Sequence, residues 1–198
     1  MKKTVLLLCL IALFLAGCGT MNMRKISVEP KFSTDNTKRS SLKAGLLLDE
    51  KFTGYKYIFE TGTQIFLLAN VKGEIEIGKN LAQALYGIVS SRFGNVAVAH
   101  DAGKISDVDI YFVPRIKSFR YSPPFTGISS HTATVELETE IFSGDGRLLR
   151  SFSIKRKGSR NMLYQIVMET NYDMAHYAVN EAIDNLLKEF SRKLDEFY

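Results

Sequence analysis

The sequence predicts an α+β fold in which an antiparallel or mixed sheet is covered on one face by two helices, at about 79–93 and 171–197. Two observations carry this prediction. In several short segments apolar and polar residues alternate, as in half-buried strands. In two longer segments apolar residues recur every three to four positions, as on one face of an amphipathic helix. No internal repeat suggests a solenoid, so the chain reads as one domain behind an N-terminal extension.

The first half of the chain supplies the shorter strands. Residues 44–48 form a continuous apolar run, which is typical of a strand buried on both faces. Residues 55–59 and 64–70 have extended character, and 73–78 alternates with a glycine at each end. After the first helix, 95–99 predicts one more short strand.

The two predicted helices are defined by long apolar stripes. The first stripe is Leu81, Ala84, Leu85, Ile88, Val89 and Phe93, and Gly94 follows where a left-handed C-cap belongs. Thr170 and Asp173 have the spacing of a capping box before the second helix. The second stripe is Ala175, Ala178, Val179, Ala182, Ile183, Leu186, Phe190, Leu194 and Phe197. We expect it to cover the protein's own sheet.

Long strands fill the region between the helices. Residues 108–121 are rich in β-formers, with Pro114 predicting an edge or a bulge because proline cannot donate to a ladder. Residues 131–142 alternate, and 143–146 predicts a hairpin turn. A four-residue loop would pair Ile141 with Leu148, Leu137 with Phe152, and Val135 with Ile154, which are all apolar cross-strand contacts.

The N-terminus has the pattern of a secretory signal. Lys2 and Lys3 precede an apolar run from Val5 to Ala16, with small residues after it. A membrane-spanning helix needs about 20 apolar residues, so this run is too short to cross a bilayer. We therefore expect residues 1–17 to be a cleaved signal peptide.

The end of this run, Leu15-Ala16-Gly17-Cys18, resembles the lipobox of bacterial lipoproteins. The resemblance implies cleavage by signal peptidase II between Gly17 and Cys18. It also implies a covalent diacylglycerol and an N-acyl chain, such as palmitate, on Cys18. The alternatives are an ordinary signal peptide with a chance cysteine, or an uncleaved anchor helix. Glycine and polar residues directly after the run argue against the helix.

Composition restricts the chemistry of the mature chain. Its two cysteines are Cys9, which leaves with the signal, and Cys18, so no thiol remains for a disulfide, zinc or nucleophilic attack. The net charge is +5, and losing Lys2 and Lys3 lowers it to +3 because no acidic residue precedes Cys18. This mild excess, without any nucleic-acid module, predicts no nucleic-acid partner.

We expect residues 18–41 to be a lipidated tether and residues 42–198 to be a periplasmic α/β domain. The tether is rich in Ser, Thr, Asn and Lys, with a short strand expected around Ile26–Val28. Its basic residues are Arg24, Lys25, Lys31, Lys38 and Arg39, and Lys43 follows at the domain start. They suit either anionic head groups or an ordinary solvated linker.

Catalytic candidates lack partners in the sequence. His100, His131 and His176 have no metal-ligand spacing. Glu136, Glu138 and Glu140 share one face of a strand, which suits the solvated side of a half-buried sheet. No nucleophile elbow, phosphate loop or dinucleotide fingerprint is present. We therefore expect no enzyme, no metal and no cofactor beyond the lipid.

Two features suit partner contact instead. The segment from Tyr121 to Ile128 joins two long strands and carries Phe125 and Ile128 beside two prolines. Exposed, these two side chains would dock onto a partner, and otherwise they tuck back onto the domain. The second feature is a basic cluster after the hairpin, which suits an acidic partner, lipid phosphates or plain solvation: Lys155, Arg156, Lys157 and Arg160.

The second half contains Asp107-Val108-Asp109-Ile110-Tyr111, Pro114-Arg115-Ile116, Gly144-Asp145-Gly146-Arg147 and a long terminal helix. This order resembles the α/β module of envelope lipoproteins such as the TolB amino-terminal domain, the curli secretion lipoprotein, penicillin-binding-protein activators and Pel polysaccharide export lipoproteins. The resemblance implies a scaffold, a ring component or a regulator. The chain lacks the membrane-inserting hairpins of the curli type, which argues against a pore. Gly19, where aspartate retains lipoproteins in the inner membrane, implies the outer membrane in an organism with two membranes.

The expected function is therefore that of a non-catalytic, periplasm-facing outer-membrane lipoprotein, which docks to or assembles a cell-envelope complex. Its partners would be the membrane, through the lipid, and an envelope protein or a second copy of itself. The alternative is a transport accessory that carries a lipid or another apolar ligand between helix and sheet, for which a large apolar cavity would be required.

Overall fold

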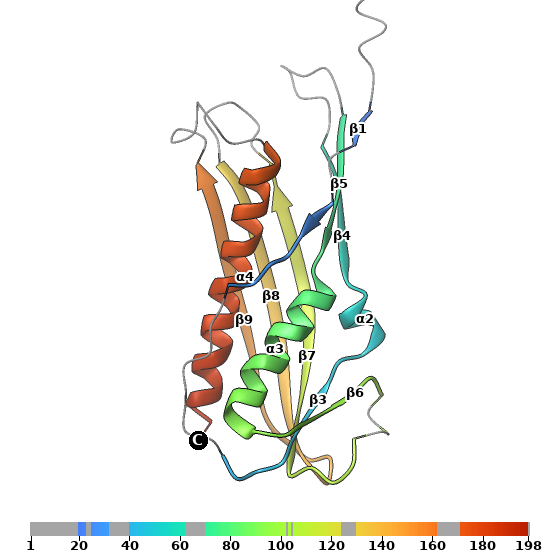
Figure 1. Ribbon diagram of the computed structural model, residues 1–198, viewed down its shortest axis with the longest axis vertical. Helices are drawn as coiled ribbons and strands as arrows, with labels where there is room; N and C mark the ends of the chain where they lie inside the picture. The colour runs from blue at the N-terminus through green and yellow to red at the C-terminus, as the bar shows by residue number, and fades with distance from the viewer. Residues whose placement is uncertain are drawn as a thin grey trace, which may run out of the picture.

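The computed structural model describes residues 20–22, 25–31, 40–61, 70–101, 103, 105–123, 130–161 and 171–197. It confirms an α+β fold with a mixed sheet covered on one face by two long helices (Figure 1). A second, small sheet lies beside this body. The strand and helix patterns of the sequence predict the main body, but not the separation of the early strands into a sheet of their own.

The main sheet has five strands in the order β6-β3-β7-β8-β9. They are β3 (Ala44–Leu47), β6 (Val96–Ala99), β7 (Ile110–Ser122), β8 (Ser130–Ser143) and β9 (Leu148–Asn161). β3 pairs in parallel with β6 and β7, whereas β7, β8 and β9 are antiparallel. The sheet is therefore mixed, with the short β6 and the long β9 at its edges.

Two long helices, α3 (Gly78–Phe93) and α4 (Asn171–Asp195), lie on the same face of the main sheet (Figure 1). Both predicted stripes face the core, with Leu85 and Leu186 completely inaccessible and Ala84 and Phe197 partly buried. α3 ends at Gly94, whose φ of 73° suits glycine and whose N–H donates to the Ser90 carbonyl. A short helix, α2 (Glu50–Thr53), precedes the second sheet.

The small sheet is organised around β5 (Asn70–Glu76). On one side it pairs antiparallel with β4 (Lys56–Thr61). On its other side it pairs in parallel with β1 (Thr20–Asn22) and β2 (Ile26–Ser27). Aromatic contacts join β4 to β7, with ring centroids 5.2 Å apart for Tyr57–Phe119 and 4.8 Å for Phe59–Tyr121.

Residues 25–31 belong to the segment expected to form the tether, and they pack onto the folded body. The strand expected around Ile26–Val28 is confirmed as β2, and the Ile26 and Val28 side chains have no exposed surface. The Glu29 amide donates to Asn180 Oδ1 on α4 at 2.7 Å. β2 therefore bridges β5 and α4.

The hairpin register differs from the prediction by two residues. Ile141 pairs with Arg150, Leu137 with Ile154 and Val135 with Arg156. Two local features cause this shift. Ser143 pairs with Arg147 around a three-residue loop with Gly146 at a φ of 87°, and a bulge follows between Ile141 and Phe142. Because the shift beyond the bulge is even, side chains from Arg150 onward keep their predicted face, whereas Leu148 lies opposite Phe142 instead of Ile141.

Pro114 lies in the part of β7 that no longer pairs with β3. The pairing of β3 with β7 ends at Phe112, so Pro114 is paired with β8 only, opposite Thr139. A second bulge, in the pairing of β7 with β8, lies nearby between Ile116 and Ser118. The missing proline N–H is thus accommodated at a local edge, as the sequence predicts.

Candidate functional site

The predicted cleavage site and acyl acceptor, Gly17 and Cys18, lie outside the described residues. The first described strand, β1, begins at Thr20, two positions after Cys18, and pairs with Asn70 of β5. Among the described residues, no helix combines the length and apolar character needed to span a membrane.

Several elements begin or end beside β1 (Figure 1). β4 and β9 end there, and β5, β8 and α4 begin there. We call this the β1 end, and we call the opposite end, with the β8–β9 turn, the hairpin end. Phe125 and Ile128, expected to contact a partner, lie outside the described residues. The ends of the segment that contains them, Pro123 and Ser130, belong to the β1 end.

The four basic residues on β9 do not form a single cluster. Side chains alternate along a strand, so Lys155 and Lys157 lie on the face of the main sheet away from the helices, which we call the outer face. Arg156 and Arg160 lie on the helix side, where each meets a side chain of α4. The sequence run is thus divided between two surfaces.

Arg156 is held in an ion-pair network on the helix side. Its Nη2 lies 2.8 Å from Glu189 Oε2, and Arg192 also donates to this carboxylate. The hydrogen bond from Arg192, followed by the contact with Arg156, lowers the pKa of Glu189 to about 2. Arg156 therefore fastens β9 to α4.

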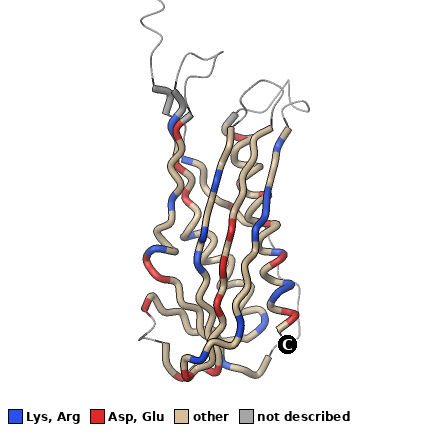
Figure 2. Tube along the Cα trace, turned by 180° about the vertical axis from the view of Figure 1, so that it is seen from behind, with Lys and Arg blue, Asp and Glu red and all other residues tan. Residues whose placement is uncertain are grey.

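The outer face carries a row of glutamates along β8 between basic residues of β7 and β9 (Figure 2). Arg115 Nη1 lies 3.1 Å from Glu140 Oε2, and Lys117 Nζ lies 3.1 Å from Glu138 Oε2. Lys155 Nζ is 3.5 Å from Glu136 Oε2. The half-buried glutamates form the solvated side of the strand, with cross-strand cations opposite them.

The three histidines lie on separate elements and have separate contacts. His100 Nδ1 is 2.7 Å from the Leu48 carbonyl oxygen, and His131 Nδ1 is 2.7 Å from the Tyr121 hydroxyl. Burial raises the pKa of Tyr121, so this hydroxyl stays protonated. His176 stacks on the Tyr172 ring. No group of three metal-ligating side chains occurs among the described residues.

A surface groove of about 510 Å³ lies where α3 meets the β3–β6 edge. Its lining mixes charged, polar and apolar groups: Lys43, Ala44, Tyr86, Asn95, Val96, Ala97, Asp107 and Val108. Lys43 Nζ and Asp107 Oδ2 form an ion pair at 2.9 Å, and Asp107 raises the pKa of Lys43 through this hydrogen bond. Sequence patterning does not single out this groove.

Two other residues missed by the sequence analysis stand out near the β1 end. Arg120 on β7 is exposed on the outer face, directly opposite Thr134, which in turn is opposite Lys157. Tyr177 on α4 is 44% exposed, with the Arg160 guanidinium 5.0 Å from its ring centroid. Neither forms a sequence motif, because strand pairing and the crossing of α4 over β9 create both arrangements.

Comparisons with known proteins give structural similarity only. No family model and no curated protein matches the chain. A Xanthomonas campestris protein of the DUF330 family is similar over 91% of this chain and 99% of its own, with a TM-score of 0.48 and 12% identity. A minor lipoprotein from Acinetobacter baumannii is similar over 80% of this chain and 93% of its own, with a TM-score of 0.46 and 13% identity. The PelC dodecamer subunit from Paraburkholderia phytofirmans is similar over 77% of this chain and 95% of its own, with a TM-score of 0.36 and 12% identity.

Proposed function

We propose that this protein is an outer-membrane lipoprotein, anchored through acyl chains on Cys18, that docks to or assembles a cell-envelope complex without catalysing a reaction. The observation that carries the proposal is the position of the lipobox cysteine relative to the folded body. Gly19 alone separates Cys18 from Thr20, where β1 begins to pair with β5.

This short connection supports a fixed location close to the bilayer. An extended chain advances at most about 3.6 Å per residue, so Thr20 lies within roughly 7 Å of the Cys18 backbone. A single acyl chain binds membranes only marginally, whereas two or more give stable attachment. The lipid would therefore hold the β1 end of the domain at the membrane surface and keep the whole domain among other envelope proteins.

The surface best suited to protein contact lies at the far end of the domain. Leu148 and Leu149 begin the edge strand β9 and are 52% and 40% exposed. Leu149 is the extra residue of the bulge between the Phe142–Leu148 and Ile141–Arg150 pairs, so both leucines are exposed where the edge strand begins. An edge strand also offers unpaired backbone groups to an incoming strand. These features support docking of another protein chain.

The lipid anchor is tested by labelling cells with a palmitate analogue. We expect label in the wild type and none in Cys18→Ser, because the Cys18 sulfur is the acyl acceptor. The matched control is Cys9→Ser, which removes the other cysteine and should leave the labelling unchanged. Normal labelling of Cys18→Ser would refute the anchor.

The docking role is tested by photo-crosslinking in intact cells, followed by mass spectrometry. A photoreactive residue at Leu149 should trap one envelope protein or a second copy of this chain. The same residue at exposed Lys188, on α4, serves as the control. If the crosslinks from Leu149 match those from Lys188, the edge of β9 has no preferred partner and the docking role is wrong.

A further inference from the structure

Two cations on the outer face near the β1 end form no ion pair with a described residue. Arg120 on β7 and Lys157 on β9 flank Thr134 of β8 in register. Strands lie about 4.8 Å apart, which places the two Cα atoms roughly 10 Å from one another on the same face. Both side chains are exposed, and neither forms an ion pair within the described parts of the chain.

This arrangement contrasts with the rest of the same face. Closer to the hairpin end, Arg115, Lys117 and Lys155 each have a glutamate of β8 within 3.5 Å. At Thr134 the row of glutamates has ended, while the rows of cations on both sides continue (Figure 2). Positive charge is therefore left uncompensated only toward the β1 end of this face among the described residues.

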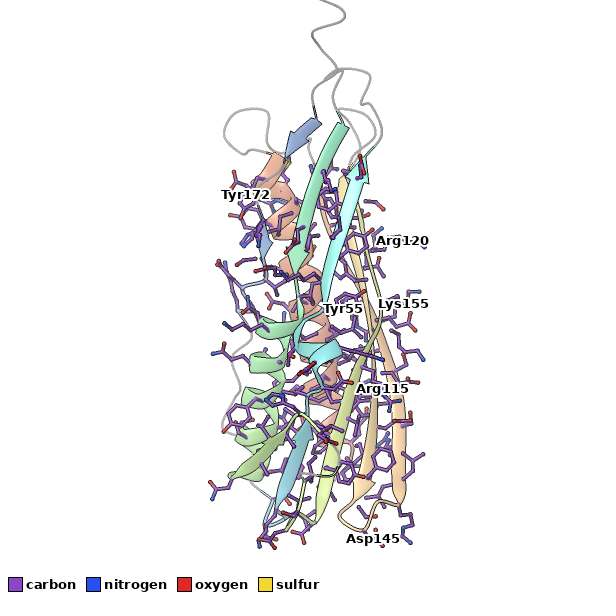
Figure 3. The ribbon with its side chains drawn as sticks, turned by 90° about the vertical axis from the view of Figure 1, so that its right-hand side faces the viewer. Tyr55, Arg115, Arg120, Asp145, Lys155 and Tyr172 are labelled. Atoms are coloured by element: carbon purple, nitrogen blue, oxygen red, sulfur yellow. The ribbon has the colours of Figure 1, made fainter. Side chains whose placement is uncertain are left out.

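The helix side of the β1 end carries a cation and aromatic rings. Arg160 lies over the exposed Tyr177 ring. One turn earlier on α4, Tyr172 stacks on His176 and donates its hydroxyl hydrogen to the Lys25 carbonyl at 3.2 Å. Figure 3 shows Tyr172 and Arg120 toward this end, on opposite sides of the domain. Tyrosine and arginine combine an apolar body with a polar tip, which suits the head-group layer of a membrane.

The charges at the hairpin end are of both signs and partly paired, because Asp107 forms an ion pair with Lys43 at 2.9 Å. Asp107, Asp109 and Asp145 gather where the β8–β9 turn meets the segment before β7, since the Gly144 amide donates to the Asp109 carbonyl at 2.8 Å. Asp145 marks this end in Figure 3. A negatively charged lipid surface would therefore attract the cations of the β1 end, which form no ion pair, more strongly than the hairpin end.

We propose that the β1 end binds the head groups of anionic phospholipids through Arg120 and Lys157 on the outer face and Arg160 with Tyr177 on the helix side. The domain then stands end-on, with the hairpin end away from the bilayer. This proposal rests on the lipid anchor proposed above. Because the anchor keeps the domain at high effective concentration near the lipid, a few weak contacts are enough to orient it.

The orientation can be measured with one spin label at a time, because the lipidated mature chain has no free thiol. Ser122 and Ser151 are both exposed on the outer face and lie eight residues apart along β8 by register, which is roughly 27 Å. Ser122→Cys or Ser151→Cys would be labelled in lipidated protein reconstituted into nanodiscs. Collision with a nickel-chelating lipid then reports proximity to the head groups.

In discs containing phosphatidylglycerol, we expect the label at 122 to collide several-fold more often than the label at 151. Reversing both charges with Arg120→Glu and Lys157→Glu should lower the collision rate at 122 several-fold, to about the rate at 151. The matched pair Arg147→Glu and Lys188→Glu changes the net charge equally on exposed positions elsewhere and should have no effect. Thermal melts monitored by circular dichroism confirm that each variant is folded.

The proposal is overturned if both labels collide equally, if discs of phosphatidylcholine alone give the same pattern, or if the matched pair also abolishes it. Mass spectrometry of the reconstituted protein separates the two proposals. If the protein is lipidated and the labels at 122 and 151 collide equally often, head-group binding is rejected, whereas the lipid anchor is confirmed. If Cys18 carries no lipid, binding of that protein to phosphatidylglycerol vesicles is titrated to high lipid concentration, where weak contacts are measurable, and equal binding by wild type and the Arg120→Glu, Lys157→Glu variant rejects head-group binding.

Discussion

Arg92 of α3 and Asp195 of α4 connect the ends of the two long helices through a bidentate ion pair. The Arg92 Nε–Asp195 Oδ1 distance is 2.8 Å, and the Nη2–Oδ2 distance is 3.1 Å. The Arg92 side chain is 5% exposed, whereas that of Asp195 is half exposed. Ser191 Oγ accepts a further hydrogen bond from Nη2 at 2.5 Å. The planar guanidinium thus fixes the spacing of the helices over the sheet.

We expect changes at this ion pair to destabilise the fold in a graded way. Arg92→Lys loses the two-pronged geometry at a buried position and should cost about 2 kcal/mol. Asp195→Asn keeps the shape but removes the charge, and should cost about 1 kcal/mol. Lys188→Gln, on the exposed side of α4, should change stability by less than about 0.5 kcal/mol. Urea unfolding measures all three, and equal values would contradict the role of Arg92.

Gly158 of β9 permits the close approach of α4. A Cβ atom at this position would lie 2.5 Å from the Ala182 amide nitrogen and closer still to the Ala178 carbonyl oxygen. Both are helix backbone atoms, so the helix itself would have to move. We expect Gly158→Ala to destabilise the protein by at least about 2 kcal/mol.

Gly87 of α3 provides the matched control for this substitution. A Cβ atom there would meet nothing within 4 Å. Gly87→Ala should therefore raise the free energy of unfolding by about 0.5–1 kcal/mol, because alanine favours the helix. Thermal melts should move in opposite directions for the two variants. A shared direction would show that the packing of α4 on β9 is not what requires Gly158.

Glu189 should make stability depend on pH in the acid range. Its pKa is lowered from an ordinary value near 4.5 to about 2 by Arg192 and Arg156. The unfolded state therefore binds more protons between these values, and the stabilisation is complete above about 4.5 and lost as the pH falls toward 2. We expect wild type to exceed Glu189→Gln by less than about 1 kcal/mol at neutral pH, since the arginines are well exposed.

The test of the Glu189 prediction is denaturant unfolding at several pH values. The gap between wild type and Glu189→Gln should close as the pH falls toward 2. In an Arg192→Gln background most of this pH-dependent gap should disappear. A gap that widens in acid would mean that the carboxylate is not stabilised by its arginine neighbours.

Gly19 should determine the membrane in which the lipidated protein resides. In an organism with two membranes, we expect Gly19→Asp to shift most of the protein to the inner-membrane fraction of a density gradient. Gly19→Ser should leave it with the outer membrane. Identical distributions of both variants would show that the residue after Cys18 carries no sorting information here.

The sequence predicted the helices and most strands because their apolar periodicity follows from burial of one face. The burial of Val135 and Leu137 followed from alternation alone. Pairing partners did not follow, because periodicity shows which side chains are buried and not which strand lies alongside. The register of β8 with β9 thus depended on a bulge, and the placement of β4 and β5 in a separate sheet depended on contacts such as Phe59–Tyr121.

The predicted contact residues illustrate the same division. Patterning found the run from Lys155 to Arg160, but not that alternate members face opposite sides of the sheet. It gave no reason to single out Arg120, whose relation to Lys157 exists only through the intervening strand β8.

What the sequence determined by itself is the prediction of a secretion signal and of a lipidation motif at Cys18, and the absence of any cysteine after that position. These are local properties, because each depends on a few consecutive residues or on composition alone. Only the tertiary structure decided that β1 pairs immediately after this cysteine, that three strands place Arg120 and Lys157 on one face, and that aspartates collect at the opposite end. Such relationships join residues distant in the chain, and only their packing brings them together.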